Sequence, residues 1–279
     1  MFGTVLWDVY RENEANDLHA AIEDIASAKD NYGWSSTGVY AFYDPTASQE
    51  GGLASPLQYL GLATDLPARF AQHNGIVRSR PGSSKKQNIH AWFEVHGILG
   101  YSAFVQSPLH QAHVARFKRE FKDTTVVDWT ENFEYERDSR DAITLLEGQL
   151  IQTSVADRGT LPPWNRIGGS RDGQMLAEGG SGTALLSLMD GSRDSLFVAR
   201  RSIRELSSDV SWSEYEFDLL HTARMQALLY AGDEGASNPD ILSWLTRRFQ
   251  PGMPSEDWHA ADSAKQMADS RYLSSSTRK

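Results

Sequence analysis

The chain has 279 residues and a formal net charge of −10, with 37 acidic and 27 basic side chains. This balance argues against a protein that coats nucleic acid without specificity, because such binding needs surplus Lys and Arg, although it still allows a local basic groove. The chain has no cysteine, which excludes disulfides, thiolate zinc sites and cysteine nucleophiles. Its first residues do not resemble a secretory signal and no apolar run approaches the roughly 20 residues of a membrane span, so we expect a soluble cytoplasmic protein without membrane partners.

The first half of the chain predicts a helix followed by two strands. Apolar residues at three- and four-residue spacing favour a helix over 10–31. Its inward face is formed by Leu18, Ile22 and Ile25. Aromatic and branched residues then predict strands at 39–44 and 57–63, joined by a polar, glycine-containing hairpin loop.

The next elements are a capped helix and a further strand. The stretch "DLPARFAQHN" predicts a helix with Thr64 or Asp65 as N-cap and Pro67 in its first turn. The stretch 88–99 predicts a strand because apolar residues alternate with polar or bulky ones along it. The apolar set is Ile89, Ala91, Phe93 and Val95.

Later elements are predicted to be mostly helical. We expect a helix at 107–122, a short strand at 124–129 and a helix at 139–155, followed by a loop at 158–173 that is dense in Gly and Pro. The predicted inward residues of the helix at 139–155 are Ile143, Leu146, Leu150 and Ile151. The predicted organisation is an N-terminal helical segment (1–35), a central domain (36–172) and a helical C-terminal region (173–279) that ends in a disordered tail.

Two short motifs and four polar positions point to a family. Gly38, Val39 and Tyr40 form "GVY", and Tyr59, Leu60 and Gly61 form "YLG", on the two hairpin strands. In this order of strands and helix, the sequence resembles the GIY-YIG nuclease family over about residues 36–168. The positions that match the family's helical arginine, its histidine one turn on, its later helical glutamate and its asparagine after a proline are Arg69, His73, Glu147 and Asn165.

The resemblance implies an α+β fold, with a small central antiparallel sheet flanked by helices, and a hydrolytic site. It assigns Tyr40 as the general base, Tyr59 as an orienting or phosphate-binding partner and Asn165 as a brace. The fixed fork of donors on Arg69 suits a phosphate, and the i, i+4 spacing puts His73 on the same helix face, where it could donate to a phosphate oxygen or hold a tyrosine hydroxyl. Position 62, often lysine in the family, is Leu62 here, which removes one expected phosphate contact.

The implied cofactor is one Mg²⁺ or Mn²⁺ ion on Glu147, since Mg²⁺ keeps several waters and accepts few protein ligands. Positive charge from Arg69 and the metal is expected to lower the pKa of a tyrosine below its usual value of about 10. We further expect all six side chains to meet around one open cavity. The helix of Glu147 should lie on the same side of the sheet as the two phenols, and a helix on the far side would contradict the metal-assisted mechanism.

Three clusters of basic residues fall within the nuclease-like half, where a phosphate track is needed. The residues predicted to contact DNA are Arg78, Arg80, Lys85, Lys86, Arg116, Lys118, Arg119, Lys122, Arg158 and Arg166. An ordinary solvated charge run is the competing interpretation. Two histidine pairings, one formed by His90, Glu94 and His96 on one strand face and one by His110 and His113, are interpreted as polar surface rather than metal ligands.

The sequence thus predicts a divalent-metal-dependent DNA endonuclease, a phosphodiester hydrolase with a restriction-like or defence-related role. A catalytically weak domain that binds DNA or protein is the alternative from another class, and an RNA-processing nuclease differs only in its substrate. Cutting of palindromic DNA needs two active sites, so a homodimer is a further hypothesis. The C-terminal region is a candidate contact for a protein partner.

Overall fold

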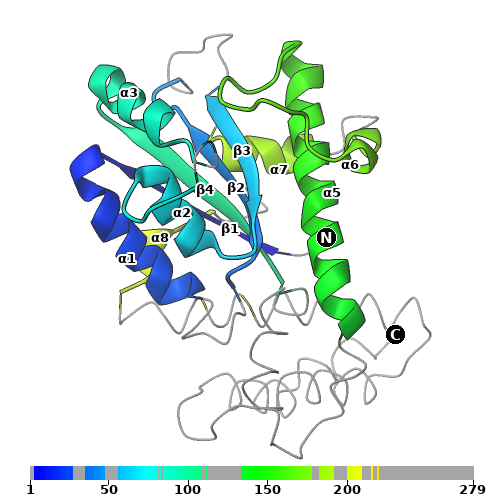
Figure 1. Ribbon diagram of the computed structural model, residues 1–279, viewed down its shortest axis with the longest axis horizontal. Helices are drawn as coiled ribbons and strands as arrows, with labels where there is room; N and C mark the ends of the chain where they lie inside the picture. Colours follow the sequence, from blue (N-terminus) through cyan, green and yellow to red (C-terminus); the bar gives the residue numbers. More distant parts are fainter. Residues whose placement is uncertain are drawn as a thin grey trace, which may run out of the picture.

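The computed structural model describes residues 3–27, 35–47, 56–80, 82, 84–107, 111, 133–177, 182–191, 200–208, 215 and 219. These residues form a mixed α+β structure around one sheet of strand order β3-β2-β4-β1-β5 (Figure 1). The fold class that the sequence predicts is therefore confirmed. No helix in this part of the chain is long and apolar enough to cross a membrane.

Four antiparallel strands make up most of the sheet. They are β1 (Gly3–Tyr10), β2 (Gly38–Tyr43), β3 (Leu57–Ala63) and β4 (Leu99–Gln106). Strand β2 lies between β3 and β4, with Tyr40 opposite Gly61 on one side and Ala103 on the other. The predicted hairpin of β2 and β3 is confirmed, and β3 is an edge strand of the sheet.

Two of these strands were not predicted. All of β4 is buried, and every residue of β1 is buried or partly buried, so neither sequence shows the apolar–polar alternation by which a half-exposed strand is recognised. Residues 3–10 therefore begin the chain as a strand, and the predicted helix over 10–31 is shorter, beginning after a 3-10 turn, η1 (Glu12–Glu14), and running as α1 (Ala15–Ala26). Its predicted inward residues Leu18, Ile22 and Ile25 are all buried.

The predicted strand at 88–99 is wrong. Residues Lys86–His96 form the helix α3, which ends at Gly97 in the left-handed conformation with φ 73°. Ile89 and Phe93, one turn apart, are buried, whereas Val95 is 77% exposed. The apolar residues thus fit both the two-residue period of a strand and the spacing of one helical turn. Only Ile89 and Phe93, which are one helical turn apart, face the core.

Helices cover both faces of the sheet. α1, α2 (Leu66–Asn74) and α3 lie on one face, where Tyr10, Phe42, Phe70 and Tyr101 pack together (Figure 1). α5 (Phe133–Arg158) and α7 (Thr183–Met189) pack on the other, against Val39, Ala41 and Leu60. The four predicted inward residues of α5 are buried, as expected. The short helix α6 (Arg171–Met175) packs on α5.

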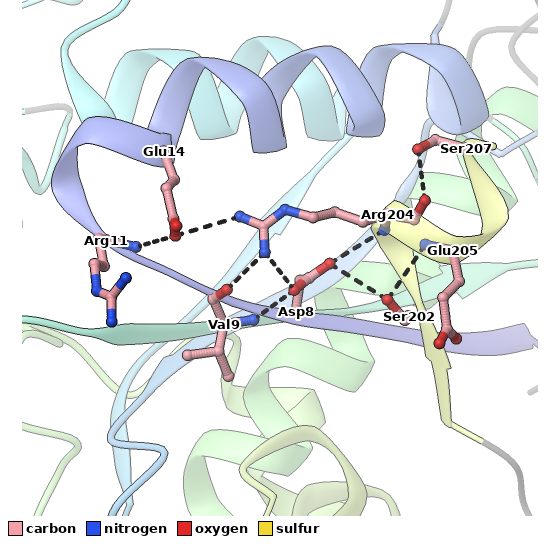
Figure 2. Close-up of polar contacts among 8 residues, drawn as sticks. All are labelled: Asp8, Val9, Arg11, Glu14, Ser202, Arg204, Glu205 and Ser207. Atoms are coloured by element: carbon pink, nitrogen blue, oxygen red, sulfur yellow. Dashed lines mark hydrogen bonds and ion pairs between the residues drawn. The ribbon is translucent and has the colours of Figure 1, made fainter.

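A short segment from the C-terminal region completes the sheet. Strand β5 (Arg200–Ser202) pairs in parallel with β1, and α8 (Ile203–Leu206) follows it directly. Residues 200–202 are therefore a strand within a region predicted to be helical. The carboxylate of Asp8 on β1 accepts hydrogen bonds from the Arg204 backbone at 3.1 Å and from its guanidinium at 3.0 Å, which fixes α8 to β1 (Figure 2).

Some predicted elements lie outside the described residues. These are most of the helix at 107–122, the strand at 124–129 and the tail at 274–279. The predicted helix at 64–74 is confirmed as α2, with Asp65 as N-cap accepting from the Ala68 amide at 2.9 Å.

Candidate active site

Two tyrosines from the hairpin strands meet at a glycine. Tyr40 on β2 is 1% exposed and Tyr59 on β3 is 9% exposed, and their ring centroids lie 5.9 Å apart. Gly61 faces Tyr40 across the strand pair, and a Cβ atom at Gly61 would lie 2.8 Å from both hydroxyl oxygens. The glycine of the "YLG" motif therefore leaves the space in which the two phenols approach each other.

Helix α2 brings two polar side chains to the same phenols. The N-cap and Pro67 begin the helix so that Phe70 faces the core and Arg69 and His73 lie one turn apart on the side of the hairpin. His73 Nε2 is 2.7 Å from the Tyr40 hydroxyl oxygen. Arg69 Nε donates to the same oxygen at 3.2 Å. Four of the six predicted site residues thus form one cluster, in which Tyr40, Tyr59 and His73 are buried and Arg69 is partly buried.

His73 is a neutral group in this cluster. Its side chain is fully buried, and its Nδ1 accepts a hydrogen bond from the backbone N–H of Lys85 at 2.8 Å. Burial, with the nearby charges of Arg69 and Lys85, lowers the pKa of His73 to about 3. Because the charged form is excluded, His73 can act as a hydrogen-bonding group but not as a cation at neutral pH.

The pKa of Tyr40 moves in the direction opposite to the prediction. Burial and the neighbouring Tyr59 raise the pKa of Tyr40 well above 10, and the charge and hydrogen bond of Arg69 oppose this shift without overcoming it. The expectation that Arg69 makes a tyrosine more acidic considered its charge but not the burial of the phenol on a strand within the core. Without a bound metal or substrate, Tyr40 is a protonated phenol at neutral pH.

Glu147 and Asn165 occupy the free edge of β3. The Leu62 backbone N–H donates to Glu147 Oε1 at 3.2 Å. The Asn165 side chain accepts from the Leu60 N–H at 2.9 Å and donates to the Leu60 C=O at 2.8 Å. These contacts satisfy backbone groups that an edge strand leaves unpaired, and they place both side chains within two residues of Gly61 along β3.

The helix that carries Glu147 is not on the expected side of the sheet. α5 packs on the face opposite the phenols, through Ile143, Leu146 and Leu150. The expectation of a shared face was wrong, because the apolar stripe of α5 covers the back of the sheet. Glu147 nevertheless reaches the edge beside the phenols, and burial raises the pKa of its carboxyl group, while the Leu62 amide and the charge of Arg69 oppose the rise.

Three cations surround this edge. Lys85 Nζ lies 4.7 Å from the centroid of the Tyr59 ring and donates to the Trp164 carbonyl at 2.7 Å. Burial and the nearby charges of Arg166 and Arg69 lower the pKa of Lys85. No carboxylate of the described residues forms an ion pair with Arg69, Lys85 or Arg166, so their charges are available to an anion.

The other predicted DNA contacts have different surroundings. Arg78, Arg80 and Lys86 are exposed on the segment from α2 to α3. Arg158 instead donates to the buried Asp190 at 3.1 Å, away from the phenols, so the structure does not bring it into the site. The remaining four predicted contacts, Arg116, Lys118, Arg119 and Lys122, lie outside the described residues.

Neither the histidines of α3 nor any other part of the described chain forms a metal cluster. His90 and Glu94 are one helical turn apart and 3.7 Å from each other, and His90 also contacts Glu12 at 2.8 Å. His96 stacks on Trp92, with ring centroids 3.8 Å apart. Across the described ranges, no group of three His, Asp or Glu side chains is placed to hold an ion. Glu147 is a single carboxylate and is not part of such a group.

Two contributors to the site were missed by sequence analysis. Trp164 donates its backbone N–H to the Gln58 carbonyl at 2.9 Å, and its ring contacts Phe42 and Trp92. The backbone amide of Lys85 holds His73. An aromatic residue directly before Asn165 was a usable signal for the first, whereas a backbone donor leaves no trace in the sequence.

Comparisons of the chain with protein-family models, with curated proteins and with solved structures found no match. The function must therefore be inferred from the geometry of the site.

We predict that Gly61→Ala destabilises the protein by about 1–3 kcal/mol, because the added methyl group must displace two buried phenols. Equilibrium urea unfolding measures this change. Gly82→Ala is the control, since its position has no atom within 4 Å of an added Cβ, although its φ of 76° carries a backbone strain of its own. An unfolding free energy for Gly61→Ala equal to that of the wild type would contradict the tight approach of the two hydroxyls.

We also predict a pH dependence of stability that His73 causes. The unfolded chain binds a proton at this histidine below its usual pKa of about 6.5, while the folded chain does not until about pH 3. Stability therefore falls with decreasing pH between these values, by about 1.4 kcal/mol per pH unit for one proton. Urea unfolding from pH 4 to 6 measures how the free energy of unfolding changes with pH. This slope should be the same in the wild type and in His96→Gln, and smaller by about 1.4 kcal/mol per pH unit in His73→Gln.

Proposed function

We propose that this protein is a metal-dependent endonuclease that hydrolyses phosphodiester bonds of DNA at the edge of β3, as members of the GIY-YIG family do. The observation that carries the proposal is the cluster of Tyr40, Tyr59, Arg69 and His73 beside the edge that binds Glu147 and Asn165. Six polar residues that are spread over 126 positions of the chain, from 40 to 165, are positioned by two neighbouring strands and the elements packed on them.

The cations supply the electrostatic part of the reaction. Hydrolysis of a phosphodiester places negative charge on the phosphoryl oxygens, and preorganised donors in a partly dry site stabilise that charge. Arg69, Lys85 and Arg166 provide three positive charges close to one another, and Arg69 also interacts electrostatically with Glu147. They offset the net charge of −10 locally and make an acidic protein able to bind a polyanion at one place.

Glu147 fits the binding of one divalent cation. Its Oε1 accepts the Leu62 amide, whereas its other oxygen has no hydrogen bond within the described part of the chain. Burial raises the pKa of this carboxyl group, so a cation beside it would relieve an unfavourable environment. Mg²⁺ or Mn²⁺ bound there would neutralise charge on the phosphate and the leaving oxygen.

Tyr40 is the proposed general base and Tyr59 its phosphate-binding partner. Arg69 Nε donates to the Tyr40 oxygen and favours its phenolate, and His73 Nε2 lies 2.7 Å from the same oxygen, while burial opposes the phenolate. The function class therefore depends on whether the assembled site with metal and substrate overcomes the cost of burial. Asn165 acts as a brace through its two bonds to Leu60.

The second candidate is a catalytically weak module that binds DNA or protein. The specific observations in its favour are the 1% exposure and raised pKa of Tyr40 and the apolar Leu62 at a position where the family often has lysine. A restriction-like or defence-related role and a homodimer remain parts of the main proposal. An RNA substrate is tested by offering RNA and DNA side by side.

Glu147→Gln should reduce plasmid nicking in Mg²⁺ or Mn²⁺ by about 100-fold or more, because the neutral amide is a poor ligand for a hard cation. The matched control on the same helix is Asp157→Asn, whose carboxylate is 72% exposed and which should cleave like the wild type. Binding of plasmid by the wild type without cleavage in either metal would favour the binding module instead.

Tyr40→Phe should abolish cleavage while leaving the fold intact, since only the hydroxyl is removed from a ring packed in the core. Tyr101→Phe is the matched control, because Tyr101 is equally buried on the neighbouring strand β4 and its ring lies 6.1 Å from that of Tyr40. Circular dichroism and a nicking assay on both variants separate the two roles. Equal activities of the two variants would contradict the assignment of Tyr40 as the base.

A further inference from the structure

The hydrogen bonds of His73 fix the position of its proton. A backbone N–H can only donate, so the 2.8 Å contact from the Lys85 amide requires a lone pair on Nδ1. A neutral imidazole carries one proton, which must then be on Nε2. The 2.7 Å contact between Nε2 and the Tyr40 oxygen is therefore a bond in which His73 donates and Tyr40 accepts.

We propose that the Lys85 backbone amide locks His73 as the Nε2–H tautomer, so that His73 is a fixed donor to Tyr40 and not the base that removes its proton. The role of His73 in hydrolysis rests on the proposed function. The assignment of the tautomer rests only on the two hydrogen-bond contacts of His73. His73 is thus a positioning residue that acts through Tyr40.

The fixed tautomer sets the direction of the hydrogen bond between His73 and Tyr40. Arg69 Nε also donates to the Tyr40 oxygen, so this oxygen accepts from two groups and the proton of Tyr40 must point elsewhere. The Tyr59 hydroxyl is the other polar group that approaches Tyr40 at Gly61. The chain of donors thus runs from the Lys85 amide through His73 to the Tyr40 oxygen.

The fixed direction bears on Tyr40 as the proposed base. Hydrogen bonds that share one direction polarise one another, so a tautomer set at a backbone amide strengthens the donor that faces the Tyr40 oxygen. A donor at that oxygen favours the phenolate, which is the form of Tyr40 that the proposed function requires.

The charged and titratable groups around His73 agree with a locked neutral ring. Those that face it are Tyr40 from β2, Tyr59 from β3, Arg69 from α2 and Lys85 from the segment before α3. Two are cations and two are phenols, and none is a carboxylate that would favour an imidazolium. A histidine in these surroundings keeps its proton on the same nitrogen across the physiological pH range.

The test is a long-range ¹H–¹⁵N correlation spectrum of the full chain labelled with ¹⁵N-histidine, which reports the protonation of each ring nitrogen. The signals of His73 among the 8 histidines are those absent from His73→Gln. We expect an unprotonated Nδ1 and a protonated Nε2, both unchanged from pH 5 to 8. A protonated Nδ1, or a titration within this range, would overturn the proposal.

Two substitutions at one position separate the amide from the side chain of Lys85. Lys85→Ala keeps the backbone N–H and should keep the tautomer, whereas Lys85→Pro removes it and should give a mixture of tautomers. If the proline variant is not folded, the comparison of His73→Gln with His73→Asn decides. Gln can place an amide N–H near the former Nε2 and Asn cannot, so cleavage by the Asn variant should be at least about tenfold slower. Equal rates would overturn the positioning role.

The tautomer of His73 and the proposed nuclease function can be disproved independently of each other. A wild-type protein that shows the Nε2–H tautomer but cleaves neither DNA nor RNA with Mg²⁺ or Mn²⁺ overturns the proposed function and leaves the lock in place. A wild-type protein that cleaves DNA but shows a protonated Nδ1 overturns the lock and leaves the function in place.

Discussion

The free edge of β3 is the constraint on which the candidate site depends. An edge strand presents N–H and C=O groups that must find partners, and in this protein the partners are side chains and a backbone amide from residues 147 to 165. Those contacts fix a helix and a loop at the strand that carries Tyr59 and Gly61. Pairing of β3 with a further strand would remove the positions of Glu147 and Asn165 together.

Burial is the second constraint, and it pushes the ionisable groups of the cluster toward neutrality. The pKa values of Tyr40 and Glu147 are raised and that of His73 is lowered, in each case with burial as the largest cause. The cations of Arg69, Lys85 and Arg166 are then the main fixed charges of the site. On the proposed function, these cations bind a polyanion, whose own charge compensates what the protein leaves unbalanced.

The sequence was sufficient where a local pattern had a single interpretation. Asp65 and Pro67 begin α2 as predicted, and the spacing of Ile143, Leu146 and Leu150 predicts both α5 and its inward face. The pattern failed at α3, where Ile89 and Phe93 fit two periods, and at β4, which is buried on both faces and shows no period at all. Both failures have the same cause: packing against other elements of the fold determined the secondary structure, and the sequence of the segment alone does not show that packing.

Within the site, residue types were predictable but their contacts were not. The motif positions indicated which side chains share the site, whereas the partners of His73, Glu147 and Asn165 include backbone amides of Lys85, Leu62 and Leu60. Every residue except proline carries such an amide, so composition and spacing say nothing about which one is used. The direction of the Tyr40 pKa shift was likewise decided by the surrounding core.

The bond between Asp8 and Arg204 has a bearing on how this chain can be shortened. These residues lie 196 positions apart, and the carboxylate of Asp8 is buried under α8. A fragment that stops before position 200 keeps every residue of the candidate site but leaves one edge of β1 unpaired and removes Ile203 and Leu206 from the core. A shortened chain that keeps the candidate site should therefore also keep β5 and α8.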